Sequence, residues 1–229
     1  MATPDEILDF WFPDGPDPTL ERHVELWTWR MRGGATDEVV ARYSDLTQRA
    51  VQGDLDHWAD TPRGRLALII VLDQFPRSVW AGTPAAYASD PKALAICLEG
   101  FDNGHFDALE NVWFKSMYKL PLEHCECAGH LANLERAIAI AEAALAAAPP
   151  HLRRLYEFAV AQPERHRAVI ARFGRHAHRN AVLGRVRPGR KMPTSAKASS
   201  RIRRGWTLIA ERVRSGTGRE LSMAAVVVA

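Results

Sequence analysis

Apolar residues recur every three to four positions through most of residues 1–185, which is the spacing of amphipathic α-helices. Several segments open with residues typical of helix N-termini, where a hydroxyl side chain precedes a proline or an acidic residue. The helices predicted from these signals begin at Thr3-Pro4-Asp5-Glu6, Thr36-Asp37-Glu38, Thr61-Pro62 and Ser89-Asp90-Pro91. The first of them must end by residues 13–16, where prolines enclose a turn.

The second half of the chain shows the same helical spacing. We expect a helix over 110–120 that is broken at Pro121, and a long helix over the Ala-, Leu- and Glu-rich residues 126–148. A pair of helices is expected over 151–161 and 163–173, the second of them beginning at its proline.

The pattern predicts an all-α fold of about nine to eleven helices joined by short Pro/Gly turns, which pack as antiparallel neighbours. Only residues 68–72 and 226–229 look strand-like, and 68–72 falls inside a helical period. An α-α superhelix of antiparallel helical hairpins fits this pattern. No strict internal repeat is visible and the 34-residue helical-repeat consensus is absent, so the repeats of such a superhelix are degenerate.

Charge divides the chain into two parts. Residues 186–229 hold ten Lys/Arg and two Glu, a net charge of +8, whereas residues 1–185 carry −5. The basic part opens with a linker-like stretch that contains Pro188, Gly189 and Pro193. We therefore expect an all-helical domain over 1–185 and a basic, poorly ordered tail over 186–229. Nucleic-acid binding would rest on that tail alone and is not expected of the domain.

Composition also excludes several classes of protein. No apolar run is long enough for a membrane span, and the first ten residues are acidic rather than basic and apolar, unlike a signal peptide. Three cysteines do not make a disulfide framework, which favours a reducing cytoplasm. Neither a phosphate-binding glycine loop nor a serine nucleophile elbow is present in the sequence.

Two segments combine acids with histidine or arginine. At the end of an apolar helix, Asp73, Gln74 and Arg77 precede or follow Pro76 at a spacing that lets the acid and the arginine pair. The alternative is an ordinary helix-terminal ion pair beside a proline. Further on, His124 and Glu126 lie between cysteines. Their spacing does not match a zinc site, so neither a metal nor another cofactor is expected, and the alternative is a core histidine beside acids.

A third segment, residues 165–185, is rich in arginine and histidine. Gly174 can end a helix there and turn the chain back. So dense a positive charge calls for carboxylates or for an anionic ligand, because Arg side chains pair well with both. Asp73 and Glu126 are the candidate internal carboxylates. The alternative is a solvated basic face.

Taken in order, four motifs resemble a bacterial domain-of-unknown-function family, number 924, over about residues 4–185. They are Phe10-Trp11-Phe12, Asp73-Gln74-Phe75-Pro76-Arg77, Tyr118-x-Leu120-Pro121-Leu122-Glu123-His124, and His166-Arg167 followed by Arg172-Phe173-Gly174-Arg175 and His178-Arg179-Asn180-x-x-Leu183-Gly184-Arg185. The resemblance implies a fold like that of tetratricopeptide-repeat (TPR) proteins. It implies no activity, so it assigns no catalytic residue.

The chain departs from the family pattern in three places. His176-Ala177 stands where the family has Phe-Pro, and Cys125-Glu126-Cys127 where it has Ser and then Glu-Asp. The cysteines are therefore interpreted as drift at small buried positions. From Val186 onward the sequence differs from the helix start that the family has there, and we hypothesise that this tail is translated out of frame.

Three functions are compatible with these residues. The leading hypothesis is a binding module whose concave face holds an anionic small molecule or a peptide carboxylate. The alternative is a hydrolase or lyase for a small substrate, with a histidine general base oriented by Asp or Glu. The third is a buried network that only specifies packing. The ten residues expected to converge are Asp73, Gln74, Arg77, His124, Glu126, His166, Arg175, His178, Arg179 and Asn180. The sequence does not predict the oligomeric state.

Overall fold

The computed structural model describes residues 2–15 and 17–186, and within them the chain is all-helical. Ten α-helices are joined by short turns and three short 3-10 helices in this part of the chain. The α-helices are α1 Pro4–Trp11, α2 Leu20–Met31, α3 Thr36–Gln52, α4 Pro62–Asp73, α5 Phe75–Val79, α6 Asp90–Asp102, α7 Val112–Tyr118, α8 Leu120–His124, α9 His130–Ala147 and α10 Arg153–Phe173. The 3-10 helices are η1 Asp56–Asp60, η2 Pro84–Tyr87 and η3 Ala177–Arg179.

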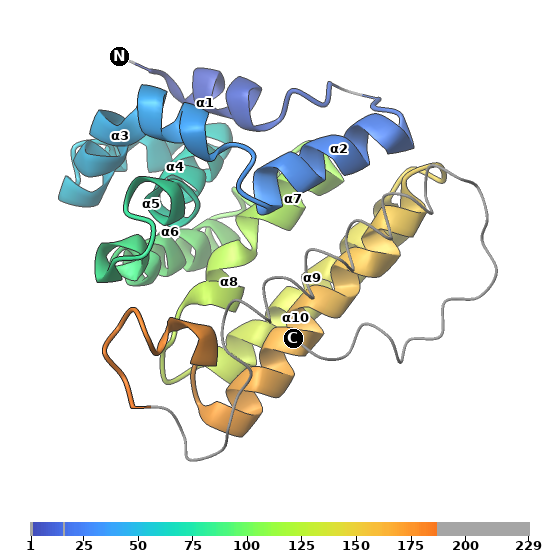
Figure 1. Ribbon diagram of the computed structural model, residues 1–229. Helices are drawn as coiled ribbons and strands as arrows, with labels where there is room; N and C mark the ends of the chain where they lie inside the picture. The colour runs from blue at the N-terminus through green and yellow to red at the C-terminus, as the bar shows by residue number, and fades with distance from the viewer. Residues whose placement is uncertain (1, 16, 187–229) are drawn as a thin grey trace.

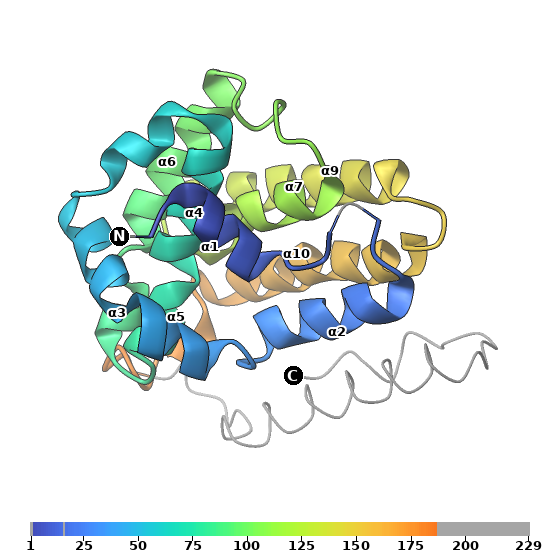
Figure 2. The ribbon, with the colours of Figure 1, turned by 90° about the horizontal axis from the view of Figure 1, so that it is seen from above.

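The helices form two groups that meet at α8 (Figures 1 and 2). One group contains α1, α3, α4, α5 and α6, and the other contains α2, α7 and the long antiparallel pair α9 and α10. The short helix α8 packs against α4 and α6 on one side and against α9 on the other. After α10 the chain turns back toward α8, so the segment that carries η3 lies at the same junction.

Helix α4 is the centre of the fold because it is mostly apolar and is buried on every side. All ten residues from Gly64 to Asp73 are buried, and α1, α3, α6 and α7 pack around them. A helix that is hydrophobic all round is stable only when neighbours cover its whole circumference. The last residue of this helix, Asp73, is therefore carried into the interior with no exposed surface.

The predicted helix starts are confirmed at Pro4, Thr36, Pro62 and Asp90. Thr3 caps α1 through a reciprocal capping box with Glu6. Residues 68–72 lie within α4, as their helical period indicates. Helix α2 was not among the predicted helices, although Thr19 caps it by accepting a hydrogen bond from the Arg22 backbone N–H. Its buried face includes the polar side chains of His23 and Arg30, which weakens the apolar pattern.

Two expected helix breaks at prolines are wrong. The expected pair of helices over 151–161 and 163–173 is one continuous helix, α10, with Pro163 inside it. An interior proline costs a helix about 3 kcal/mol, and here the packing of α10 along α9 offsets that cost. Pro121 does not break a helix over 110–120 either. Helix α7 has already ended at Tyr118, and Pro121 lies in the first turn of α8.

The predicted basic tail, its linker and the strand-like residues 226–229 lie outside the described residues, apart from Val186. The out-of-frame hypothesis for the tail stays a prediction. Within the described part of the chain, no helix combines the length and the apolarity that a membrane span requires.

Gly100 marks a close approach of α6 to its neighbours. A Cβ at this position would lie 1.7 Å from Tyr118 Oη and 2.6 Å from Arg65 Cδ. We expect Gly100→Ala to destabilise the protein by about 1–3 kcal/mol, because overpacking forces a buried neighbour to move. Thermal unfolding followed by circular dichroism measures this, and Gly129→Ala is the control, since nothing lies within 4 Å of its Cβ. Equal melting temperatures for the two variants would contradict the packing argument.

Candidate functional site

The junction between α4 and α5 fixes the first part of the site. Gln74 is both the C-cap of α4 and the N-cap of α5, and Pro76 prevents α4 from continuing. The chain therefore turns directly after Asp73 and brings Arg77 back over it, with Arg77 Nη2 3.5 Å from Asp73 Oδ1. Arg77 also donates to the Asp73 carbonyl, and Gln74 donates to the Asp73 carboxylate. The pairing expected from the four-residue spacing is present.

His124 reaches the same carboxylate from α8. Its Nδ1 lies 2.9 Å from both oxygens of Asp73. Burial raises the pKa of Asp73, but the charge of Arg77 and the hydrogen bonds from His124 and Gln74 outweigh burial and hold that pKa well below its ordinary value. Burial lowers the pKa of His124, and Asp73 only partly offsets this. At neutral pH Asp73 is therefore ionised and His124 is neutral.

A second carboxylate, Asp90 at the start of α6, joins two arginines. Arg77 Nη2 lies 3.0 and 3.2 Å from its two oxygens, and Arg179 Nη1 lies 2.8 Å from Asp90 Oδ2. Both guanidinium groups also lie against the ring of Tyr87, at 5.7 Å for Arg77 and 4.4 Å for Arg179. The turn after Gly174, which has a φ of 67°, returns the chain so that Arg179 reaches this position. Buried carboxylates of the protein thus pair with both arginines.

Glu123, next to His124, is the centre of a neighbouring buried network. It pairs with Lys119 and, at 3.0 Å, with His166 Nδ1. Burial raises the pKa of Glu123, but the charge of Lys119 and the contacts with His166 hold that pKa at about 2. The Glu123 carbonyl is contacted by His130 Nε2 at 3.1 Å and by His176 Nε2 at 2.9 Å.

The histidines of both networks form a continuous row of rings. His176 is its middle member, with ring centroids 5.2 to 5.4 Å from those of His130, His166 and His178. His124 extends the row, 6.3 Å from His166. Burial lowers the pKa of His176, and the nearby charge of Arg179 lowers it further. This side chain therefore stays neutral in the folded protein.

A cavity of about 290 Å³ lies beside the His124–Asp73 pair. Its lining includes two arginines, three further polar side chains and a tryptophan: Arg30, Arg77, Thr36, Gln74, Ser78 and Trp11, in addition to His124. A cavity of this size suits a small molecule rather than an extended peptide. Among the described residues, His124 forms hydrogen bonds only through Nδ1, and its Nε2 is therefore free to act on a molecule in the cavity.

Arg30 reaches this cavity from a fully buried ion pair behind it. Asp14 accepts hydrogen bonds from both Nη atoms of Arg30, at 2.5 and 3.3 Å, and lies 2.6 Å from His23 Nδ1. Tyr156 completes the network at 3.3 Å from His23 Nε2. Arginine and carboxylate therefore balance each other here as well.

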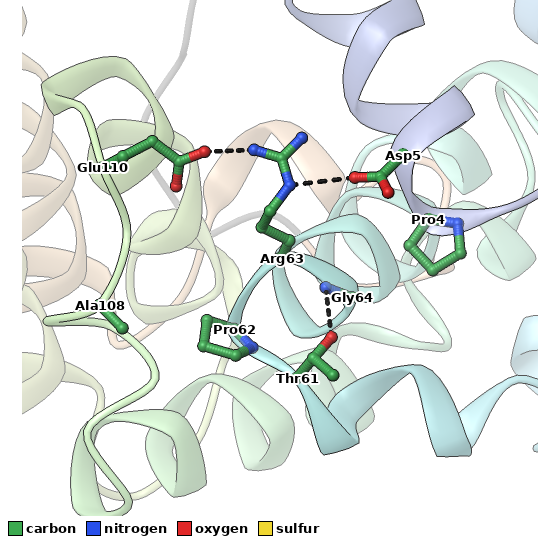
Figure 3. A pocket seen from close by; sticks show the side chains of 8 residues that line it. All are labelled: Pro4, Asp5, Thr61, Pro62, Arg63, Gly64, Ala108 and Glu110. Carbon is green, nitrogen blue, oxygen red and sulfur yellow. Dashed lines mark hydrogen bonds and ion pairs between the residues drawn. The ribbon is translucent and has the colours of Figure 1, made fainter.

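A larger and more open cavity, about 490 Å³, lies elsewhere, between the N-termini of α1 and α4 (Figure 3). Its single cation, Arg63, pairs with Asp5 and Glu110 on either side. Histidine does not line it, and its acids are exposed and already paired. We place the candidate site at the smaller cavity because only that one adjoins a buried acid and a histidine with a free nitrogen.

The predicted site residues form two linked groups rather than one. Asp73, Gln74, Arg77, His124 and Arg179 meet through Asp73 and Asp90. Glu126, His166 and His178 belong to the neighbouring network, where Glu126 accepts a hydrogen bond from the His176 backbone at 2.6 Å and pairs with Arg185.

Arg175 and Asn180 are not joined to either group by a hydrogen bond of their side chains. Arg175 Nη2 donates to the carbonyl of Val186 at 2.8 Å, away from the arginine pair. Asn180 is buried, and its Oδ1 has no hydrogen-bond partner among the described residues. The structure therefore joins Arg77 and Arg179 through Asp90, and an anion shared by Arg77, Arg175 and Arg179 stays a prediction.

A family model described as a bacterial protein of unknown function (DUF924) matches residues 7–189. The chain belongs to this family. Among solved structures, the chain is similar to a protein of unknown function from Agrobacterium tumefaciens, with 28% sequence identity and a TM-score of 0.58. That match covers 81% of this chain and 92% of the other. A comparison with curated proteins found no match.

The cysteines of this DUF924 protein differ in their surroundings. Cys125 is buried, as expected, but Cys127 is exposed, so the interpretation as small buried positions is wrong for Cys127. Cys127 lies three residues after the end of α8. In the part of the chain that the structure describes, no three His, Cys, Asp or Glu side chains are arranged to hold a metal ion.

Sequence reasoning missed the partners that neutralise the site. Asp90 was interpreted only as part of a helix start, and Lys119 stands at the unspecified position of the motif that begins at Tyr118. Asp14 and Arg30 lie in a turn and in the unpredicted helix α2. The sequence did hold a signal for Asp90. The many arginines of residues 165–185 require buried acids as partners, and Asp90 pairs with one of these arginines, Arg179.

The free energy of unfolding should fall as the pH drops below about 6.5. Below that pH the histidines of the unfolded chain bind protons, whereas buried histidines of the folded protein stay neutral. The folded pKa of His176 is lowered, so its contribution is present at pH 7.5 and declines by about 1.4 kcal/mol per unit below pH 6.5. We expect His176→Gln to lose about 1.4 kcal/mol less than the parent between pH 7.5 and 5.5. Urea unfolding at both pH values measures this.

His57→Gln is the control for that experiment, because His57 is exposed on η1. Its pH dependence should equal that of the parent. Equal pH dependence for His176→Gln and the parent would contradict the assignment of a buried neutral imidazole.

Proposed function

We propose that this protein is an enzyme that acts on a small polar substrate in the 290 Å³ cavity, with His124 as the general base and Asp73 as the group that orients it. One observation carries the proposal. The His124–Asp73 contact of 2.9 Å is within the reach required of a base and its orienting group, and it adjoins a cavity.

The protonation states support this role. A general base must be neutral to accept a proton, and burial lowers the pKa of His124 so that it is neutral at pH 7. Its partner must be ionised to stabilise the imidazolium that forms, and Arg77 keeps the pKa of Asp73 low. Because the carboxylate holds Nδ1, the proton resides there and Nε2 presents its lone pair.

The charges favour catalysis over the anion-binding module that the sequence first suggested. Arg77 and Arg179 are answered by Asp73 and Asp90 rather than left for a ligand. These arginines then act as positioning residues. Arg77 fixes the Asp73 carboxylate, which in turn fixes the plane and tautomer of the His124 ring, and Arg179 helps to hold Asp90, the second partner of Arg77.

In a hydrolysis, His124 Nε2 would take a proton from a water molecule as the water oxygen attacks an electrophilic carbon of the substrate. The same nitrogen would then return the proton to the leaving group as its bond to that carbon breaks. Asp73 would stay ionised throughout and stabilise the positive ring between these steps. In a lyase reaction, Nε2 would take a proton from a carbon of the substrate. The electron pair of that C–H bond would form a double bond as the leaving group departs from the neighbouring carbon with its own bonding pair.

Two broader expectations support this picture without deciding the chemistry. The antiparallel hairpin of α9 and α10 is the kind of unit from which a TPR-like superhelix is built. A buried thiol at Cys97 and an exposed one at Cys127 suit a reducing, cytoplasmic location.

The test incubates the parent protein, His124→Gln and His57→Gln with a small-molecule extract of bacterial cells, and follows each compound by mass spectrometry. We expect the parent and His57→Gln to consume at least one compound at the same rate. His124→Gln should consume it about 10²- to 10⁴-fold more slowly, the usual contribution of a general base. Urea unfolding of each variant establishes that it is folded.

Two results would count against the proposal. One is that the parent protein consumes no compound of the extract. The other is that folded His124→Gln consumes the same compound as fast as the parent, which would leave the Asp73–His124 pair with a role in packing alone.

A further inference from the structure

The connection between α8 and α9 carries two thiols that the proposed reaction does not use. Cys125 and Cys127 are separated by one residue, Glu126. Cys125 is buried, with 3% of its surface exposed, whereas Cys127 is exposed. An exposed thiol can be reached by an oxidant, and a second thiol close to it can displace the oxidised group and close a disulfide.

The local backbone places both thiols on the same side of the chain. Cys125 is extended, with φ −74° and ψ 119°, and alternate residues of an extended segment point the same way. Glu126 is held elsewhere, because its carboxylate accepts a hydrogen bond from the His176 backbone at 2.6 Å and pairs with Arg185. Two trans peptides keep the Cα atoms of the cysteines within about 7 Å, next to the range of about 4.4–6.8 Å that a disulfide joins.

The side chains of the two cysteines are hydrogen-bonded to each other. Burial and, to a smaller extent, the contact with Cys127 raise the pKa of Cys125 to about 12, so Cys125 keeps its proton and donates it toward the Cys127 sulfur. That sulfur also accepts a hydrogen bond from Asn133 Nδ2 at 3.5 Å. The exposed sulfur is therefore held beside the buried thiol, with the Cys125 proton between them.

The third cysteine of the chain, Cys97, lies outside this arrangement. It is fully buried in α6, and its Sγ donates to the Tyr118 carbonyl at 3.3 Å. Burial also raises the pKa of Cys97 well above its ordinary value. Cys97 is therefore a thiol that an oxidant in solution should not reach, and it serves as an internal control.

We propose that Cys125 and Cys127 form a reversible oxidation site, at which a hydroperoxide converts the two thiols into a disulfide. A disulfide in a reducing compartment is transient, so this bond would sense oxidants rather than hold the fold together. The inference is independent of the proposed function, because it uses neither the cavity nor the ring of His124.

The chemistry takes place in two steps that balance. The Cys127 thiol releases its proton, and its sulfur attacks the hydroperoxide, so that an S–O bond forms as the O–O bond breaks. The departing alkoxide or hydroxide takes up a proton and leaves as an alcohol or water. The Cys125 sulfur then attacks the Cys127 sulfur, and an S–S bond forms as the S–O bond breaks. The hydroxyl group leaves with the Cys125 proton as water, and the two electrons lost by the thiols have reduced the hydroperoxide.

The experiment oxidises the folded full chain with a small excess of hydrogen peroxide, then unfolds it, blocks the remaining thiols and digests it with trypsin. Residues 120–136 form one tryptic peptide that contains both Cys125 and Cys127, and Cys97 lies in another, residues 93–115. We expect the first peptide to lose the mass of two hydrogens and to escape blocking, and dithiothreitol to reverse this. The Cys97 peptide should be fully blocked throughout.

Variants separate the two steps. Cys127→Ser removes the exposed thiol, so peroxide should leave the remaining thiols unchanged. Cys125→Ser removes the resolving thiol, so the reaction should stop at a sulfenic acid on Cys127. Dimedone traps sulfenic acids, and we expect it to label Cys127 in this variant at least tenfold more than Cys97. Circular dichroism establishes folding, and if Cys125→Ser unfolds, the parent and Cys127→Ser decide.

Three results would overturn the proposal. One is that the peptide over 120–136 keeps both thiols after peroxide treatment of the folded parent. Another is that the parent accumulates a dimedone-labelled or further oxidised Cys127 without the disulfide. The third is that the disulfide joins Cys127 residues of two chains, which appears as a covalent dimer in a denaturing gel without reductant. Each result leaves the enzyme proposal standing, because that proposal is tested by compound consumption under reducing conditions.

Discussion

The ionised carboxylate of Asp73, at the end of the helix that is buried on every side, is the constraint on which the candidate site depends. A lone buried carboxylate is costly, so the fold has to bring positive and hydrogen-bonding groups to it. Two separate segments do so: α5 supplies Arg77 and α8 supplies His124. The Arg77 guanidinium also pairs with Asp90, which in turn pairs with Arg179 of η3. The arrangement of the site therefore follows from the ion pair and hydrogen bonds that stabilise the buried charge of Asp73.

Local patterns predicted those features that depend on neighbours in sequence. The Asp73–Arg77 pairing follows from spacing, and the turn at Gly174 follows from a residue that tolerates positive φ. The continuity of α10 through Pro163 could not be predicted, because packing against α9 overrides the local cost of a proline. The same limit applies to Asp90, whose partners come from α5 and η3 and whose sequence context shows only a helix start.

The candidate site was predictable in its residue types but not in its charge balance. Counting arginines along residues 165–185 suggested an excess of positive charge. In the fold, acids from elsewhere in the chain pair with three of these arginines: Asp90 with Arg179, Glu126 with Arg185 and Glu135 with Arg167. What remains for a ligand beside the 290 Å³ cavity is the Nε2 atom of His124, because its Nδ1 is already held by Asp73. A hydrogen-bonding atom that is free for a ligand can be identified only when the partner of every other polar atom around it is known from the structure.

The junction at Gln74, which ends one helix and begins the next, also restricts how the length of the chain can change. Each helical residue rotates the chain by about 100°, so one residue inserted between Asp73 and Arg77 would turn the guanidinium away from both carboxylates. The connection between α6 and α7, over residues 103–111, has no such register to keep with the site. Among natural variants of this fold, insertions and deletions should accumulate in that connection, while the interval from Asp73 to Arg77 keeps a constant length.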